Sequence, residues 1–444
     1  FFSTVSLLPD FGMRCLHRTL TQLRSAYSRR WYSDLERLAK LRSDTEVLAN
    51  ELNIVRENAE RIRVMDDIHF YAQGEQTPVS PAMLTAFAKH PNKQSSLLQG
   101  SLFLHRELPF RLAMRVQDLD SLPRGLMVLP ELQQVREWYI TSFKELRTFS
   151  FSKPSAKPAD IPPFHQLLRA IFHRHIKVPE QMAKGCLELR SQLQHFYGSS
   201  WWDHADRITV DNILQSFFLS RIGIRFLLEQ QLVLHDQIID GAVMPADVFG
   251  LLSLNVKARD IADIAVAKAC RNCKASVGVK PEVEVYSDPD NNTTFVQIPS
   301  HMEFILLQLL QNAIQNHVER YGTDAVGSGE APPVRVVVAD GPKCDHITFR
   351  VTDMGRGAPR SQIPKFWSYL HDHSGPQWVG GDSENVYGLP LAKLTAEYFG
   401  GHMQLVSLEG TGTTGYVHLL KMTEKSAHTE QLPSGEVANR HYLL

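Results

Sequence analysis

Apolar residues recur at three- and four-residue intervals through the first half of the chain, which is the period of amphipathic helices. Prolines at positions 123, 154, 158, 162 and 163 end helices or mark surface turns. Long amphipathic helices with short connections indicate an antiparallel bundle over residues 33–240. The spacing predicts helices over residues 33–73, 82–89, 99–120, 132–149, 164–196 and 211–236.

From about residue 250 the pattern changes, because runs of alternating apolar and polar residues now stand between helical segments. Alternation with a period of two is typical of half-buried strands. Strands mixed with helices indicate an α/β sandwich over residues 245–422, so the fold class is α+β. We expect a loop at 322–333 and a polar tail at 423–444 to be mobile. The predicted strands are 282–286, 293–298, 334–339, 346–352, 403–407 and 414–420, with helices at 255–273, 301–320 and 391–399.

The strand at 346–352 runs directly into Asp353, Gly355 and Gly357, an Asp-x-Gly-x-Gly motif. A carboxylate at a strand end can accept a hydrogen bond from an exocyclic amine. Glycines two residues apart let the backbone turn tightly and approach a planar ligand. These features suit an adenine ring, although the motif alone is equally typical of a loop with turn glycines.

Three neighbouring segments favour the nucleotide interpretation. The helix at 301–320 carries a polar stripe of Gln308, Asn312 and Gln315 beside its apolar face. Gly388 and Leu389 open a second helix, whose N-terminal amides and dipole favour a phosphate. A glycine-rich turn precedes the last strand and contains Gly410, Gly412 and Thr413.

This ordered set resembles the nucleotide-binding domain shared by histidine kinases, type II topoisomerases, MutL and heat-shock chaperones. Within that group the chain most resembles the mitochondrial kinases of pyruvate dehydrogenase and branched-chain 2-oxoacid dehydrogenase. The resemblance covers most of the chain. It is carried by Glu107-Leu108-Pro109, Arg111-Leu112-Ala113, Leu122-Pro123, Trp138-Tyr139, Ser142-Phe143, Arg174-His175, Met182-Ala183, Gly185, Arg221-Ile222-Gly223-Ile224-Arg225, Tyr398-Phe399 and Gly401.

The resemblance implies ATP and Mg²⁺ as cofactors, with Asn312 as the metal ligand. Gln308 stands where the family has the glutamate proposed as general base, and His175 matches a histidine near that base. An amide cannot take up a proton. The remaining residues that the resemblance assigns to nucleotide are Gln315, Asp353, Gly355, Gly357, Gly388, Leu389, Gly410, Gly412 and Thr413.

Further departures lie at the phosphate end of the expected site. The family's three glycines before the second helix become Glu384, Val386 and Gly388, so only the last remains. Gln311 and Gln315 stand where the family usually has lysine and arginine. His175 alone is equally consistent with a structural histidine.

The leading interpretation is a mitochondrial matrix serine kinase that inactivates the first component of the pyruvate or branched-chain complex with MgATP. The resemblance also implies a homo- or heterodimer and docking on the lipoyl domain of the complex. The alternative is a catalytically impaired regulatory subunit paired with an active paralogue. A sensor histidine kinase is disfavoured, because no transmembrane or sensor segment is recognised. The tail lacks the Asp-Trp pair of pyruvate dehydrogenase kinases.

Composition adds few constraints. A net charge of −1 gives no electrostatic reason to expect nucleic-acid binding. The sequence contains no run of about 18 apolar residues, the length needed to span a membrane. Cys270 and Cys273 lack a second ligand pair, which disfavours zinc. Five cysteines without a framework suit a reducing compartment.

The N-terminal residues 1–32 predict a mitochondrial transit peptide. No acidic residue occurs from Phe11 to Ser33, where five arginines alternate with leucines. Met13 is the expected start of translation, which makes the first twelve residues an extension of the gene model. A disordered basic arm is the alternative interpretation.

Overall fold

The computed structural model describes residues 53–88, 92–123, 128–153, 155–239, 241, 245, 247–289, 293–341, 344–371, 387–422 and 429–433. The chain forms two compact units, Phe1–Asp67 and Ile68–Leu444. In the first unit the described residues, 53–67, are helical, as the charged periodic pattern predicts. The expected transit peptide lies outside the described residues.

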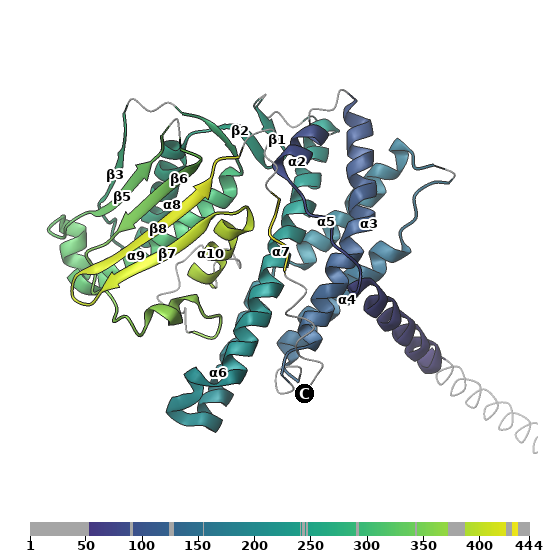
Figure 1. Cartoon of the computed structure of the whole chain (residues 1–444), viewed down its shortest axis with the longest axis horizontal. Coiled ribbons are helices and arrows are strands. Elements are labelled where there is room, and N and C mark those ends of the chain that lie inside the picture. Colours follow the sequence, from purple (N-terminus) through teal and green to yellow (C-terminus); the bar gives the residue numbers. More distant parts are fainter. Residues whose placement is uncertain are drawn as a thin grey trace, which may run out of the picture. The chain divides into compact units, whose positions relative to one another are not determined.

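The first part of the second unit is helical (Figure 1). Helices α3 and α7 pack along each other, α4 packs on α3, α5 packs on α3 and α7, and α6 packs on α4. The helices are α2 (Pro81–Ala88), α3 (Lys93–Asp120), α4 (Pro130–Thr148), α5 (Ile161–Arg174), α6 (Val178–Tyr197) and α7 (Ala205–Ile238), with 3₁₀ turns η1 (Pro158–Asp160) and η2 (Gly198–Asp203).

The single helix predicted over 164–196 is two helices, so that prediction was wrong. The chain leaves the helical path at His175, and α6 begins afresh with Pro179 in its first turn. Proline lacks an N–H and disfavours a helical residue before it, so it fits a new first turn but not a helix interior. The break places His175 at the end of α5.

The second part holds a five-stranded sheet in the order β3-β5-β6-β8-β7, in which only the β3–β5 pair is parallel. A separate small sheet has the order β1-β2-β4. The strands are β1 (Val248–Phe249), β2 (Leu252–Val256), β3 (Val283–Ser287), β4 (Phe295–Gln297), β5 (Val334–Ala339), β6 (His346–Thr352), β7 (His402–Leu408) and β8 (Gly412–Leu420).

Helices α8 (Ala258–Val277), α9 (Pro299–Ser328) and α10 (Leu389–Tyr398) lie against one face of the large sheet (Figure 1). A short 3₁₀ turn, η3 (Ile363–Trp367), follows β6. On β6, the residues Ile347, Phe349 and Val351 are buried against these helices. The alternation seen in the sequence therefore corresponds to one packed face, and the α+β fold is confirmed.

Helix α9 extends further than predicted. Its helical hydrogen bonding continues to Ser328, although Gly322 interrupts it with a φ of 80°. Such a positive φ costs glycine little, so the chain kinks and then resumes the helix. Part of the segment expected as a mobile loop, 322–333, is therefore helical.

Five residues of the expected mobile tail, 429–433, are described, and Glu430 is buried among them. Its carboxylate accepts hydrogen bonds from Arg111 on α3, from the Val79 amide and from the Tyr398 hydroxyl. The sequence predicted a tail mobile throughout and did not predict this buried contact. The residues next to Glu430 in the sequence do not distinguish it from an exposed polar residue.

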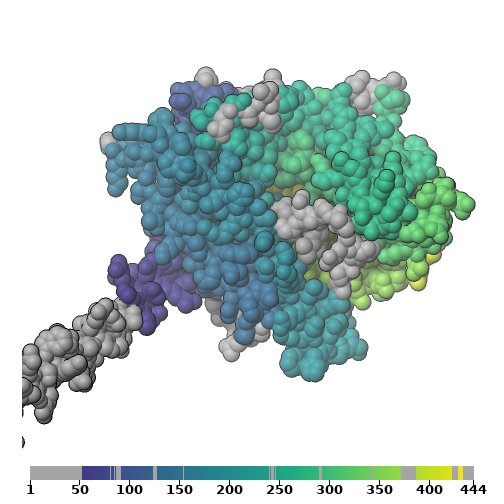
Figure 2. Space-filling view, turned by 180° about the vertical axis from the view of Figure 1, so that it is seen from behind, coloured from purple at the N-terminus to yellow at the C-terminus, as the bar shows by residue number. Residues whose placement is uncertain are grey.

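From behind, the surface of the helical part, coloured blue to teal, adjoins the green surface of the sandwich (Figure 2). Within the second unit, α10 packs on α7, so the two parts share an internal boundary. No helix among the described residues has the length and apolar character needed to cross a membrane.

Candidate functional site

One face of α9 carries a polar side chain every four residues, at Gln308, Asn312, Asn316 and Arg320. Residues four apart on a helix lie one above the other. Gln308 is buried, the two asparagines are half-buried, and Arg320 reaches the surface. The polar stripe inferred from the sequence therefore continues through Asn316 and Arg320, which sequence reasoning did not select.

Asp353 lies at the end of β6 and is 3% exposed. Its Oδ1 accepts hydrogen bonds from the backbone N–H of Gly355 at 2.7 Å and of Thr413 at 3.1 Å. Burial raises the pKa of Asp353 to about 6, although the two backbone donors and the Asn316 side chain partly offset that effect. The strand end thus holds a fixed hydrogen-bond acceptor.

The Asp-x-Gly-x-Gly loop and the glycine-rich turn before β8 approach each other through bare backbone. A Cβ on Gly357 would lie 2.0 Å from the Leu408 carbonyl oxygen, and one on Gly412 would lie 2.3 Å from the Asp353 carbonyl oxygen. Both glycines also have positive φ, 63° and 133°. No other residue fits these positions without displacing the partner loop.

Arg320 holds the same two loops together from the helix side. Its Nη1 donates to the carbonyl oxygens of Met354 at 2.9 Å, Gly355 at 2.8 Å and Gly410 at 3.0 Å. The two N–H groups of this nitrogen are shared among the three carbonyl oxygens, and the planar guanidinium fixes their direction. In the sequence, Arg320 could have been found by its four-residue spacing from Asn316, which continues the spacing of Gln308 and Asn312.

Gln308 faces the start of α10. A Cβ on Gly388 would lie 3.5 Å from the Gln308 Oε1 atom. Gly388 has a φ of 52° and precedes the first turn of α10, where Leu389 and Pro390 stand. The base position and the expected phosphate-binding helix start are therefore neighbours, while the substituted positions 384 and 386 lie outside the described residues.

The two glutamines at the family's basic positions differ in their surroundings. Gln311 is buried, and its Nε2 has no hydrogen-bond partner among the described residues. Gln315 instead donates to Glu319 at 3.0 Å on the exposed side of α9. The two positions therefore differ in both burial and hydrogen bonding.

His175 is enclosed at the end of α5. Its Nε2 lies 3.0 Å from the Ser142 hydroxyl, and its ring lies against Tyr139 with the centroids 4.5 Å apart. Burial lowers its pKa to about 3, and the charge of Arg221 adds to the effect. The imidazole is consequently neutral near pH 7, and Arg174 donates to the same Ser142 hydroxyl.

Asn312 suits the Mg²⁺ that the fold implies. In the described parts of the chain, its Oδ1 accepts one long hydrogen bond of 3.4 Å, from the Asn316 amide. Mg²⁺ usually takes one or two protein oxygens and completes its shell with waters and substrate phosphates. No cluster of three or more His, Cys, Asp or Glu side chains in the described parts of the chain could hold a metal alone.

Comparison with known proteins matches two family models to this chain. The model of the mitochondrial branched-chain alpha-ketoacid dehydrogenase kinase covers residues 78–253. The model of the histidine kinase-, DNA gyrase B- and HSP90-like ATPase covers residues 297–423. The two matches correspond to the helical part and to the sandwich.

Curated relatives agree with the two models. The mitochondrial pyruvate dehydrogenase (acetyl-transferring) kinase of Arabidopsis thaliana is 32% identical over 385 residues, which covers 83% of this chain and 96% of the relative. The chain belongs to the dehydrogenase kinase family. Isozyme 1 from Homo sapiens is 29% identical over 394 residues, 85% of each chain. The Ascaris suum kinase is 28% identical over 386 residues, 85% of this chain and 90% of the relative.

Membership of the dehydrogenase kinase family supports ATP use, because the ATPase model covers the part of the site built from α9, β6, α10 and β8. The roles expected from the sequence for Gln308, Asp353, Gly355 and Thr413 stay predictions.

Proposed function

We propose that the protein transfers the γ-phosphate of MgATP to a serine of the first component of a 2-oxoacid dehydrogenase complex and thereby inactivates the complex. The observation that carries this proposal is the convergence of Asp353, Gly355 and Thr413 beside the polar face of α9. Its relatives are named as kinases of pyruvate dehydrogenase. The branched-chain complex remains the second candidate target.

Each part of the site has a separate task in this reaction. Asp353 accepts a hydrogen bond from the exocyclic amine of adenine, and Asn312 supplies an oxygen to Mg²⁺. A Mg²⁺ ion held there would supply positive charge that stabilises the phosphates. The amides at the start of α10, after Gly388, favour the phosphate by their direction and dipole.

Gln308 orients the substrate serine without taking its proton. Its Oε1 can accept a hydrogen bond from a hydroxyl, but a neutral amide is not a base at pH 7. Phosphoryl transfer depends mainly on positioning and electrostatic stabilisation, so a rate survives the loss of the base. We expect this rate to be reduced by the 10²–10⁴-fold that general-base catalysis commonly contributes.

Radiolabelled ATP with the purified first components of the pyruvate and branched-chain complexes tests the proposal. Label on a serine of one component, together with loss of dehydrogenase activity, is the expected result. Transfer to neither component, by protein that binds MgADP, would contradict catalysis and favour the regulatory alternative.

That alternative is a kinase-like subunit that pairs with an active paralogue. The presence of Gln308 at the base position is the observation that favours it. It predicts no transfer by the protein alone, and a changed rate when the paralogue is added. A homo- or heterodimer is proposed in either case.

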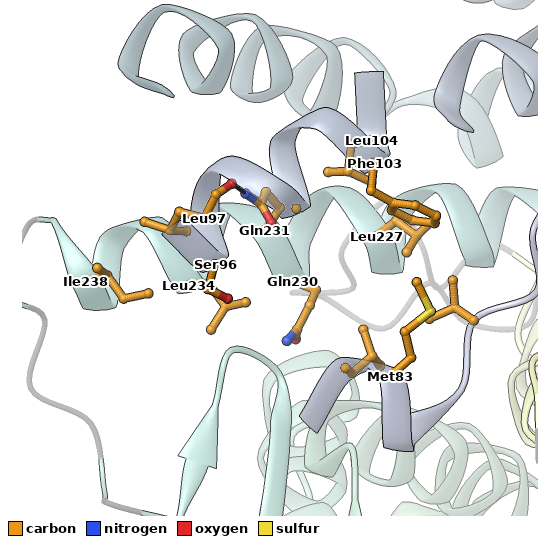
Figure 3. A pocket seen from close by; sticks show the side chains of 13 residues that line it. Met83, Ser96, Leu97, Phe103, Leu104, Leu227, Gln230, Gln231, Leu234 and Ile238 are labelled. Atoms are coloured by element: carbon orange, nitrogen blue, oxygen red, sulfur yellow. Dashed lines mark hydrogen bonds between the residues drawn. The ribbon is translucent and has the colours of Figure 1, made fainter. Parts of the chain in front are cut away.

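An apolar cavity between α2, α3 and α7 is a candidate dock for the lipoyl arm of the complex (Figure 3). Met83 faces Phe103 and Leu227 across it, and Gln230 and Gln231 supply polar edges. The cavity measures ≈ 40 Å³, room for only a few waters. A lipoyl arm would therefore enter only after the flexible Met83 side chain moves aside.

We propose that the protein works in the mitochondrial matrix. Its curated relatives are named as mitochondrial kinases. The acid-free, arginine-rich residues 11–33 support import. The matrix is also where a kinase of this kind would meet its substrate complex.

A further inference from the structure

Asp211 on α7 joins the helical part to the sandwich, and the inference made here rests on the nucleotide site of the proposed function. Its side chain is 16% exposed. The Oδ1 atom accepts hydrogen bonds from the Ser368 hydroxyl at 3.0 Å and from the backbone N–H of Tyr369 at 2.9 Å. The Oδ2 atom lies 2.8 Å from the same hydroxyl and accepts a hydrogen bond from Arg207 at 2.9 Å. One largely buried carboxylate therefore fixes two successive residues of the sandwich.

Three aromatic rings continue this contact toward the start of α10. The ring of Phe218, further along α7, is stacked with that of Tyr369, and their centroids lie 5.2 Å apart. Tyr387 meets both rings edge-on, with centroid distances of 5.0 Å to Phe218 and 5.4 Å to Tyr369. Tyr387 is 2% exposed, and its hydroxyl donates to the Cys186 Sγ atom on α6 at 3.4 Å. The helical part therefore holds both tyrosines.

Tyr387 directly precedes Gly388, the residue at which the backbone enters α10. The proposed function assigns the phosphates to the amides of that first turn. Because Tyr387 is joined to Gly388 by one peptide bond, a change in the place of its ring shifts the backbone that leads into these amides. The cluster of Phe218, Tyr369 and Tyr387 therefore connects Asp211 to the phosphate end of the site.

The 3₁₀ turn η3, just before Ser368, is held by weaker contacts with the same end of the helical part. The Trp202 ring in η2 carries Arg207 with its guanidinium carbon 4.5 Å from the centroid and Lys365 with its ammonium 5.4 Å away. Cation–π contacts of partly exposed groups contribute little each. The hydrogen bonds of Asp211 instead join a charge to Ser368, which is 3% exposed. Asp211 is therefore the residue whose loss releases this stretch most directly.

We propose that Asp211 is a positioning residue for the phosphates of the nucleotide. By fixing Ser368 and Tyr369 it holds Tyr387, and with it the first turn of α10, in the place that receives the phosphates. It acts through these residues and not by contact with the nucleotide. The base end, at Asp353 and Thr413, is fixed separately by β6 and β8, so the loss of Asp211 weakens phosphate binding selectively.

Calorimetry with MgADP and with adenosine, which lacks the phosphates, tests the proposal. Asp211→Ala should bind MgADP about tenfold more weakly than wild type, the equivalent of one hydrogen bond to a charged group, and should bind adenosine equally well. Asp211→Asn should lose less, because it keeps an oxygen for the Tyr369 amide. Asp236→Ala is the matched control, since it removes an ion-paired aspartate at the far end of α7, and it should bind both ligands as wild type does.

The outcomes separate this inference from the function beneath it. Unchanged MgADP binding by Asp211→Ala, with normal wild-type binding, overturns the inference and leaves the function standing. An equal loss for MgADP and adenosine also overturns it, because it indicates a disturbance of the whole site. Absence of MgADP binding by wild type overturns the proposed function and the inference with it.

A thermal melt checks that each variant is folded at the temperature of the titrations, so that lower stability alone does not change the measured affinity. Ser368→Ala replaces Asp211→Ala if that variant does not fold. It removes the hydroxyl donor but leaves Asp211 paired with Arg207 and the Tyr369 amide. It should show a smaller loss with the same preference for MgADP, and normal MgADP binding by Ser368→Ala would then overturn the inference.

Discussion

The Oε1 atom of Gln308 lies 3.5 Å from the point where Gly388 would carry a Cβ. The residue at the base position therefore faces the backbone at the start of α10, where a phosphate is expected. A carboxylate at position 308 would stand at the same place with almost the same shape. The substitution removes proton uptake and leaves the geometry of the site in place.

We expect Gln308→Glu to raise phosphorylation of the dehydrogenase serine by up to the 10²–10⁴-fold that a general base commonly supplies. Initial rates with radiolabelled ATP measure this gain, and MgADP calorimetry serves as the control for an intact site. If Gln308→Glu changes little, the loss of glycines at positions 384 and 386 limits turnover, and Glu384→Gly with Val386→Gly is needed. Wild-type activity equal to that of a glutamate-bearing kinase, unchanged by the substitution, would contradict our view of position 308.

Asp353→Ala should abolish detectable binding of MgADP. It removes the expected acceptor for adenine and also leaves the amides of Gly355 and Thr413 without their shared oxygen. Calorimetry measures the loss. Asp353→Asn is the partner variant, because it keeps an oxygen for those amides but lacks the charge, and it should weaken binding less than alanine does. Full ADP affinity in both variants would contradict the placement of the base.

The strands of the sandwich were predictable because their alternation is local. Strands β5 and β6 begin and end at the residues predicted from the sequence, Val334–Ala339 and His346–Thr352. The contacts of Arg320 were not predictable, since they join α9 to loops 34 to 90 residues away. A polar residue on a helix face is by default solvated, and only the folded chain shows which acceptor it meets.

The burial of Glu430 escaped prediction for the same reason. Its partners, Val79, Arg111 and Tyr398, lie 32 to 351 residues away along the chain. The break between α5 and α6 is a different case. Pro179 lies in the first turn of α6, but the apolar period on both sides of it predicted one continuous helix.

Acid should destabilise the protein through His175. The unfolded chain protonates this residue below its ordinary pKa of 6.5, whereas burial holds the folded pKa at about 3. The stability that depends on neutral His175 is therefore lost as the pH falls from 6.5 toward 3. Between pH 7 and pH 5 the free energy of unfolding falls by about 2 kcal/mol, because one pKa unit corresponds to about 1.4 kcal/mol.

Urea denaturation of wild type and of His175→Gln at pH 7 and pH 5 measures this contribution. Glutamine can keep a hydrogen bond to Ser142 but does not titrate, so the variant should lose about 2 kcal/mol less than wild type over that interval. The comparison cancels other groups, such as Asp118, whose burial raises its pKa to about 6 and acts in the opposite direction. Equal losses in the two proteins would show that protonation of His175 does not lower the free energy of unfolding.

Glu430→Ala should lower the free energy of unfolding by about 3–5 kcal/mol, because it leaves the buried guanidinium of Arg111 without a main counter-charge. Glu107 also pairs with Arg111, at 3.0 Å, and keeps the loss toward the lower end of that range. Urea denaturation measures the change. The double variant Arg111→Met with Glu430→Leu is the control, since apolar replacement of both partners removes the uncompensated charge and should recover much of the stability. A loss below about 1 kcal/mol for Glu430→Ala, the range of exposed ion pairs, would show that the segment 429–433 does not hold this buried position in solution.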